Sequence, residues 1–483
     1  MQVAVAGATG FVGRALVAAL VGGGYDVVAL SRREVRLPGA ITRVVDVGDE
    51  AALGDALGGC DAAYYLVHSL GVGDFRRRDL RLAEGFGRAA AVAGVERIVY
   101  LGGLGDDPES DHLASRQEVG VALRDAGVPV VELRAAVILG AGSISFEMLR
   151  YLTERLPVMV CPRWVRTAIQ PISLGDVLAY LTRSLDVSPG VYEIGGADVT
   201  TYREMIGTYA HVRGLRRRRI LDVPYLTPRL SSYWVDLVTP VDQTVTHALI
   251  ESLTVEVIVH RAEETAASFG IEPVGSGAAI EAALDDQARI VDGELLTREP
   301  GLADGIYTER AVAPVAADAT ERADADLDDI GGSYRWYGLA SAWRLRAGLG
   351  RLVGERWWLR RPARVEPGAL VDWWSVTRRE PSRLVLRGQD WFFGEGWLGF
   401  EIREFDLVVI GALRTKGAPG FLYWKLLRPL HRRIFVGLAR YRAARAERPP
   451  SSTGEPFPPA GLSSLPRPRA RGPRTRSGRP RCP

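Results

Sequence analysis

Three glycines near the N-terminus have the spacing of a phosphate-binding turn. The segment 7–13 follows the short apolar run 3–6 and opens an amphipathic run that begins near Gly10. Gly7 would permit a tight turn, Gly10 a close approach of the backbone to a pyrophosphate, and Gly13 close packing of a helix on a strand. The spacing predicts dinucleotide binding, with a purely structural turn as the alternative. The expected contacts come from Gly7, Thr9, Gly10, Phe11, Val12 and Gly13.

The residues after the next two apolar runs would recognise the adenosine end of the dinucleotide. The second run ends in Ser31, Arg32 and Arg33, where an enzyme that selects an unphosphorylated ribose usually has Asp or Glu. A hydroxyl and two guanidinium groups suit a 2′-phosphate, so we expect NADP in preference to NAD. A solvated arginine pair is the alternative. Asp46, followed by Val47, could accept from the adenine amino group or cap the next helix.

Strand-sized and helix-sized runs alternate through the first 140 residues or so and would position these groups. Short apolar runs cover 3–6, 26–30, 42–45, 62–67, 97–101 and 128–133, with amphipathic runs between most of them. This alternation predicts right-handed βαβ crossovers and therefore an α/β fold with a doubly wound parallel sheet covered by helices on both faces. Residues 141–292 are expected to add a smaller lobe on the substrate side.

Segments at the ends of these runs resemble the extended, atypical short-chain dehydrogenase/reductases, of the NmrA-like or epimerase-like kind. The segments are 7–13, 65–69 (Tyr-Leu-Val-His-Ser), 100–103 and 133–136. The resemblance covers about 1–292 and implies a Rossmann-type NAD(P)-binding domain, without specifying a reaction. It implies that the nicotinamide lies near His68, Gly102, Gly103 and Ala135, and it adds Leu66 and Val67 to the cofactor-binding residues.

The residues that such dehydrogenases use for proton transfer are replaced in this chain. In active relatives a tyrosine donates the proton, a lysine four residues later lowers its pKa, and a serine or threonine orients the carbonyl. Here His112 and Arg116 have the tyrosine–lysine spacing, Gly102 and Gly103 take the hydroxyl position, and the only lysines are Lys416 and Lys425. His112 could relay a proton and Arg116 could hold the ribose, although a neighbouring arginine disfavours the imidazolium.

Two alternatives concern these histidines. The segment around His112 and Arg116 could be a non-catalytic helix start capped by Ser110 or Asp111. His68 could bind substrate or be a packed loop residue. No histidine pair has metal-ligand spacing, so we expect no metal.

The C-terminal half has a different composition. Residues 293–305 are expected to be a linker in a stretch that becomes rich in Ala and Asp, and nine of the eleven tryptophans fall between 336 and 424. Residues 306–446 predict several antiparallel strands and a long final helix. They resemble the helix-grip fold of START-related and polyketide-cyclase-like proteins and a domain of unknown function that often follows such dehydrogenases. The resemblance implies an apolar cavity for a small apolar molecule, with core packing of the tryptophans as the alternative.

The remaining features limit the class of protein. Residues 447–483, rich in Pro and Arg, are expected to be a disordered tail. A net charge of +3 gives no reason to expect nucleic acid, and three scattered cysteines fit the cytoplasm. Peripheral membrane contact stays open, and the arginine run 213–219 could bind an acidic partner or form a charged surface turn.

Together these features predict a cytoplasmic NADP-binding oxidoreductase. It would transfer a hydride to a carbonyl, an enone or a quinone-type apolar substrate. The alternative is a non-catalytic NADPH-binding redox sensor or assembly factor.

Overall fold

The computed structural model describes residues 1–69, 74–105, 111–223, 255–296, 305–338, 340–352, 359–388 and 393–447. All but the first residue of the expected tail, and Ser110, lie outside the described residues. The chain forms two compact units, each built from separate stretches of sequence. One contains 1–309, 385–399 and 410–429, and the other contains 310–384, 400–409 and the chain from 430 onward. No helix among the described residues is long and apolar enough to cross a membrane.

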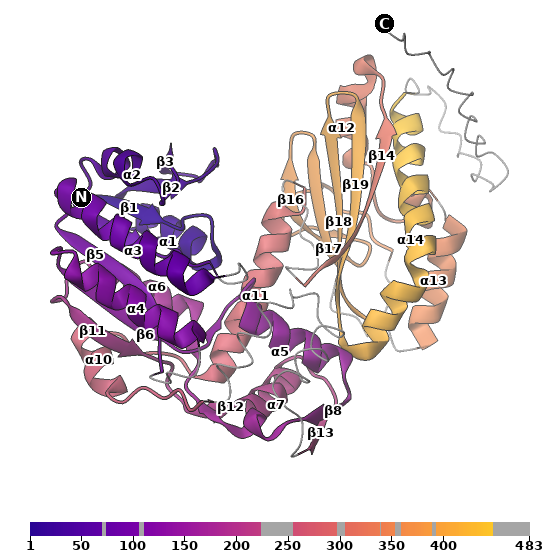
Figure 1. Ribbon diagram of the computed structural model, residues 1–483. Coiled ribbons are helices and arrows are strands. Elements are labelled where there is room, and N and C mark those ends of the chain that lie inside the picture. Colours follow the sequence, from indigo (N-terminus) through magenta and orange to yellow (C-terminus); the bar gives the residue numbers. More distant parts are fainter. Residues whose placement is uncertain are drawn as a thin grey trace, which may run out of the picture. The chain divides into compact units, whose positions relative to one another are not determined.

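A seven-stranded parallel sheet forms the core of the first unit (Figure 1). Its strands are β1 (Gln2–Ala6), β2 (Asp26–Ser31), β3 (Ala40–Val44), β4 (Ala62–Tyr65), β5 (Arg97–Gly103), β6 (Val130–Ala135) and β11 (Gly190–Ile194). They lie in the order β11-β6-β5-β4-β1-β2-β3, and every pairing is parallel. The order reverses between β1 and β4, the kind of point at which doubly wound sheets bind ligands. The predicted doubly wound Rossmann sheet is confirmed.

Helices cover both faces of this sheet. The flanking helices are α1 (Phe11–Gly22), α2 (Glu50–Leu57), α3 (Phe75–Val92), α4 (Asp111–Asp125) and α6 (Leu174–Arg183). Alternate strand residues face opposite ways, as strand geometry requires. Val3 and Val5 pack with apolar residues of α1 and α6, whereas Ala4 and Ala6 pack with those of α2, α3 and α4.

The substrate-side lobe of the first unit has its own apolar core. Its helices are α5 (Ile144–Arg155), η1 (Arg163–Arg166), α7 (Tyr202–Val212), α10 (Ala262–Phe269) and α11 (Ser276–Glu294). Its short strands are β7 (Ile138–Leu139), β8 (Val158–Cys161), β9 (Ala168–Ile169), β10 (Ile172–Ser173), β12 (Thr200–Thr201) and β13 (Arg219–Asp222). Phe146, Tyr209 and Ile280 meet in the core, which joins α5, α7 and α11.

Buried ion pairs tie two C-terminal stretches into the first unit. Arg414 donates to the carboxylate of Glu395 at 2.5 Å and to the carbonyl of Leu284 in α11 at 2.6 Å. The indole of Trp397 donates to Asp292, also in α11, at 2.8 Å. Buried charges are stable only when paired, so these contacts hold residues 385–399 and 410–429 against the lobe.

The C-terminal half contains a six-stranded sheet and a long helix. The strands are β14 (Tyr307–Pro314), β15 (Leu370–Val371), β16 (Trp374–Glu380), β17 (Arg383–Gly388), β18 (Gly394–Arg403) and β19 (Asp406–Thr415), in the order β14-β19-β18-β17-β16-β15. The helices are η3 (Ala317–Ala319), α12 (Thr320–Leu327), η4 (Tyr334–Tyr337), α13 (Ala340–Leu352) and α14 (Gly417–Ala446). The sequence analysis did not single out β19 and α12 as separate elements.

Aromatic residues of the second unit pack on one another around a buried carboxylate. Asp372 accepts from the indole of Trp336 at 2.8 Å and from the phenol of Tyr337 at 3.3 Å. The indole of Trp374 donates to Tyr337 at 2.9 Å, and the Tyr337 ring stacks on that of Trp343 with centroids 4.3 Å apart. Burial raises the pKa of Asp372. These particular aromatic residues therefore build a core of their own.

We predict opposite effects for alanine at two helical glycines. A Cβ on Gly87 in α3 would lie 2.4 Å from the Cβ of Ala126, just beyond α4, whereas a Cβ on Gly54 in α2 meets no atom within 4 Å. Overpacking should make Gly87→Ala lower the free energy of unfolding by about 1–3 kcal/mol. Gly54→Ala should raise it by about 0.5–1 kcal/mol through helix propensity. Urea unfolding followed by circular dichroism measures both, and equal midpoints for the two variants would contradict the packing argument.

Candidate functional site

The glycine turn leaves no room for side chains at two of its three glycines. Gly7 has a φ of +85°, and a Cβ there would lie 2.9 Å from the carbonyl carbon of Leu66. A Cβ on Gly13 would lie 2.1 Å from the Gly7 carbonyl oxygen. Gly10 is the extended N-cap of α1 and provides no side chain to pair the first-turn N–H groups. These donors and the helix dipole fit a pyrophosphate.

The other predicted residues of the turn lie around these glycines. Thr9 and Gly10 are exposed, and the carbonyl of Thr9 accepts from the Arg14 guanidinium at 3.0 Å. Val12 packs on the apolar core that the sheet forms with α1 and α6. Phe11 lies against Gly140, where a Cβ would come within 2.8 Å of its ring. The backbone of the turn is therefore the accessible part, as phosphate binding requires.

The predicted adenosine end of the site is open and cationic. Ser31 ends β2, and its hydroxyl accepts from the backbone N–H of Arg33 at 3.3 Å. Arg32 and Arg33 are exposed, and neither forms an ion pair within the described part of the chain. The guanidinium groups are thus available for a phosphate.

Asp46 does not cap the helix that follows it. The N-cap of α2 is Asp49, whose carboxylate accepts from the N–H of Ala52 at 3.2 Å. Asp46 lies two residues after β3, is exposed, and accepts from Gly48 N–H at 2.9 Å. Its neighbour Val47 packs on the core. The capping alternative was wrong because the helix begins three residues later than that role requires.

The carboxyl ends of β4, β5 and β6 bring the remaining cofactor candidates to one edge of the sheet. Leu66 and Val67 directly follow β4, and the Leu66 N–H donates to Ala6 of β1 at 3.0 Å. Gly102 and Ala135, near the ends of β5 and β6, are buried. They would offer a cofactor backbone groups and space, and no polar side chain. His68, two residues beyond Leu66, remains exposed.

Histidines 68 and 112 share an electrostatic environment with Arg116. Burial, then the Arg116 guanidinium, and then His68, lower the pKa of His112 to about 3. Desolvation by the surrounding protein, and then Arg116, lower the pKa of His68 to about 4. The His68 ring is exposed, so water screens these effects more than at His112. Both imidazoles are therefore neutral near pH 7 in the unliganded protein. For His112 the effect of Arg116 agrees with the prediction from the sequence, although burial is the larger cause.

Arg116 occupies space that a hydroxyl residue would need. A Cβ on Gly103 would lie 3.3 Å from Cγ and 3.5 Å from Cβ of Arg116. The first distance is tighter than most contacts of real Cβ atoms and the second is an ordinary contact, so a serine at 103 would require the Arg116 stem to shift by a few tenths of an ångström. The glycine at the end of β5 and the stem of Arg116 in α4 are thus in close contact.

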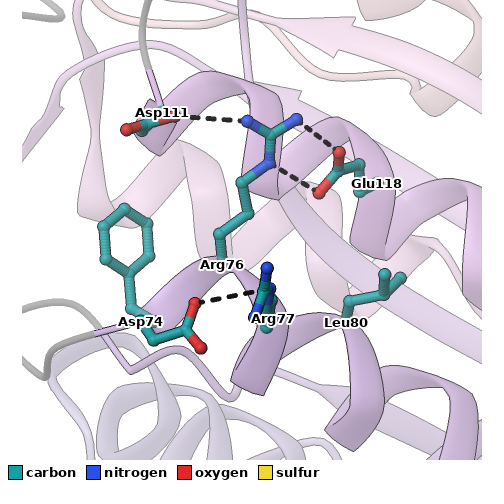
Figure 2. A pocket seen from close by; sticks show the side chains of 7 residues that line it. Asp74, Arg76, Arg77, Leu80, Asp111 and Glu118 are labelled. Atoms are coloured by element: carbon teal, nitrogen blue, oxygen red, sulfur yellow. Dashed lines mark hydrogen bonds and ion pairs between the residues drawn. The ribbon is translucent and has the colours of Figure 1, made fainter.

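An ion-pair cluster fixes the first turns of α4 against α3 (Figure 2). The Arg76 guanidinium contacts both carboxylate oxygens of Glu118, at 2.9 and 2.5 Å, and Asp111 at 3.2 Å. Asp111 is the first residue of α4 and precedes His112. Arg76 lines a surface pocket of about 500 Å³ together with Phe75 and Leu80. The two-oxygen contact gives this exposed pair more directionality than an ordinary surface ion pair.

Three buried polar atoms belong to β4, α3 and α4, and none of their residues was a predicted site residue. The hydroxyls of Tyr65 and Ser115 and Oδ1 of Asp79 have no hydrogen-bond partner among the described residues. Burial, and then the Asp79 carboxylate, raise the pKa of Tyr65, so this tyrosine is a poor substitute for the missing proton donor. Only the position of Ser115 directly before Arg116 could have drawn attention to one of them.

Comparisons with known proteins agree with the fold. Residues 7–128 match a family model described as NAD(P)H-binding, and residues 302–438 match one described as a protein of unknown function, DUF2867. No curated protein matches the sequence.

Several solved structures are similar to part of this chain at low identity. A nucleoside-diphosphate-sugar epimerase from Staphylococcus aureus is 14% identical, with a TM-score of 0.49, over 58% of this chain and 100% of its own. The enzyme WbmG of Bordetella bronchiseptica, solved with NAD, is 16% identical, with a TM-score of 0.48, over 60% and 94%. UDP-glucose 4-epimerase from Thermotoga maritima is 14% identical, with a TM-score of 0.46, over 59% and 99%.

We predict that neither His68 nor His112 titrates between about pH 5.5 and 8. Proton NMR of the imidazole signals, assigned with His68→Gln and His112→Gln, measures this. Removing the guanidinium in Arg116→Met should raise the pKa of both histidines, because its positive charge lowers both. Arg88→Gln, which removes an exposed arginine paired with Glu50, is the control and should leave both signals unchanged. A His112 signal that titrates near its ordinary value would contradict the environment described above.

Proposed function

We propose that the protein is an NADP(H)-dependent reductase of carbonyl or enone-type compounds. What carries the proposal is the placement of His112 and Arg116, one helical turn apart in α4, with the Arg116 stem against Gly103 at the carboxyl edge of a dinucleotide-binding sheet. When bound, the nicotinamide supplies the hydride to the substrate carbon. The substrate oxygen then needs one proton and, until it arrives, hydrogen-bond donors.

His112 and Arg116 would divide these tasks. A neutral imidazole donates an N–H to a developing oxyanion, which lowers the barrier without a stored proton. Arg116 offers a permanent cation for ribose hydroxyls. The negative charge of a bound dinucleotide would offset the guanidinium and raise the pKa of His112 from about 3, which favours proton delivery in the loaded site.

The preference for NADP is part of this proposal and rests on the open arginine pair after Ser31. A 2′-phosphate adjacent to Arg32 and Arg33 would find two exposed cations directly after β2, with Glu34 as the next residue of the same loop. The adenosine ribose of NAD has no 2′-phosphate, so it would lie near the same arginines without an ionic contact.

The apolar substrate is also a proposal, supported by the tryptophan-rich C-terminal half and its resemblance to helix-grip proteins. A six-stranded sheet and a 30-residue helix are elements that such a fold uses. Trp336, Trp343 and Trp373 pack on Tyr337, so they would not be the residues that line a cavity.

A second candidate, a non-catalytic NADPH sensor or assembly factor, is favoured by one observation. Neither histidine at the site holds a proton near pH 7 in the unliganded protein, and the nearby Tyr65 is a poor acid. A protein that only reports dinucleotide occupancy needs no acid.

Replacing both Arg32 and Arg33 by Ala should weaken NADPH binding about 10- to 100-fold, because charge-assisted hydrogen bonds to the 2′-phosphate are lost. NADH binding should change little. Arg36→Ala, an exposed arginine further along the same loop, is the control. Isothermal titration calorimetry with both dinucleotides measures the preference, and an unchanged NADPH-to-NADH ratio would remove the argument from the arginine pair.

NADPH oxidation should be detectable with a panel of enones and quinones. In His112→Ala the turnover number should fall by about 100-fold, while the dissociation constant for NADPH stays within a factor of about 2. His260→Ala, an exposed histidine paired with Glu193, should behave as the unaltered protein. Tight NADPH binding with no turnover of any compound, or turnover indifferent to His112→Ala, would favour the sensor.

A further inference from the structure

A basic depression lies on the substrate-side lobe, away from the carboxyl edge of the large sheet. It has a volume of about 1050 Å³ and is formed by η1, α7, the turn after α7, and β13. Four arginines line it, Arg166, Arg203, Arg217 and Arg218, against one carboxylate, Glu204. At neutral pH these five side chains carry a formal charge of +3. The depression therefore has the sign and size of a site for an anionic small molecule.

Arg218 is held in place by backbone groups and not by a carboxylate. Its Nε donates to the carbonyl of Thr153 at 2.8 Å and its Nη1 to the carbonyl of Arg216 at 2.9 Å. Within the described ranges no carboxylate lies at ion-pairing distance from it, and burial lowers the pKa of its guanidinium. The charge of Glu154 opposes this shift without an ion pair, so the half-buried cation is incompletely compensated, and an anion in the depression would add a direct partner.

The single carboxylate of the depression has another role. Oε2 of Glu204 accepts from the hydroxyls of Thr201 at 3.1 Å and Thr200 at 3.3 Å. The Thr201 hydroxyl in turn accepts from the Glu204 N–H at 3.1 Å, which caps the start of α7. Glu204 thus stabilises the helix terminus, and its oxygen is directed to hydroxyl groups.

Apolar side chains line part of the depression, and its arginines are planar donors. Ile206, Leu215 and Ile220 line it, and of these Ile206 is buried in the lobe core. Guanidinium groups match phosphate oxygens two at a time, and apolar side chains accommodate an uncharged remainder. We propose that this depression binds a small molecule that carries two or more phosphate groups, at a site separate from the dinucleotide site.

Inorganic pyrophosphate is the probe, titrated calorimetrically into the full-length protein at low ionic strength. Arg217→Gln removes an exposed lining arginine and should weaken binding about tenfold. Arg216→Gln removes the preceding exposed arginine, which does not line the depression, and should bind as the unaltered protein. Titration of protein saturated with NADPH separates this site from the dinucleotide site, whose glycine turn also fits a pyrophosphate, and should give unchanged binding. The Arg32→Gln/Arg33→Gln double variant should also bind normally. Raising the salt concentration should weaken binding in all of these proteins. The effect should be smaller in Arg217→Gln than in the others.

Three results would overturn the proposal. They are no pyrophosphate binding, a loss of binding confined to the Arg32→Gln/Arg33→Gln variant, and equal losses in Arg216→Gln and Arg217→Gln. A membrane source of phosphate is tested by cosedimentation with phosphatidylserine-phosphatidylcholine vesicles, with phosphatidylcholine vesicles as the control. Cosedimentation that needs Arg217, in a protein that does not bind pyrophosphate, would replace the small ligand by a lipid surface. Unchanged thermal unfolding of Arg217→Gln excludes misfolding as the cause of a loss.

Discussion

The cofactor end of the molecule depends on the contact between the Gly7 backbone and two neighbouring elements. A Cβ on Gly13 would come within 2.1 Å of the Gly7 oxygen, and a Cβ on Gly7 within 2.9 Å of the Leu66 carbonyl. The first contact fixes the start of α1 relative to the end of β1. The second fixes the end of β1 relative to the residues that follow β4. Because strand order reverses between β1 and β4, the orphan N–H groups of α1 lie at the position where doubly wound sheets bind ligands.

The altered proton-transfer residues are coupled by sterics as well as by charge. The Arg116 stem lies beside Gly103, and burial together with the charge of Arg116 keeps His112 and His68 neutral. A serine at 103 would require Cβ and Cγ of residue 116 to shift, and a lysine has the same two atoms. The contact therefore links position 103 to position 116 without selecting arginine over lysine.

The sequence predicted the elements whose signal is local. One of the amphipathic runs between the apolar runs covers 50–57, which are the bounds of α2, because its N-cap, its apolar spacing and its end all lie within a few residues. The large sheet and its edge followed from the alternation of runs. Asp46 was misjudged because both Asp46 and Asp49 fit a cap by type, and only the backbone decides between them. The contact of Gly103 with Arg116 is not local, since it depends on how α4 packs on β5. The same holds for the carboxylate of Asp372, whose partners lie about 35 residues away in the chain.

Arginine also holds together segments that the sequence assigned to different domains. Arg387 contacts Asp292 at 3.2 Å and Glu395 at 2.5 Å, and Arg414 contacts Glu395 and the carbonyl of Leu284. Asp292 and Leu284 belong to α11, whereas the arginines belong to β17 and β19. Separating the chain between 293 and 305 would leave the half-buried Asp292 and the buried Glu395 and Arg414 with fewer partners, and an unpaired buried charge costs several kcal/mol. The strands of the C-terminal half therefore contribute to the stability of the lobe that contains α11, and residues 385–399 and 410–429 belong to the same compact unit as the glycine turn.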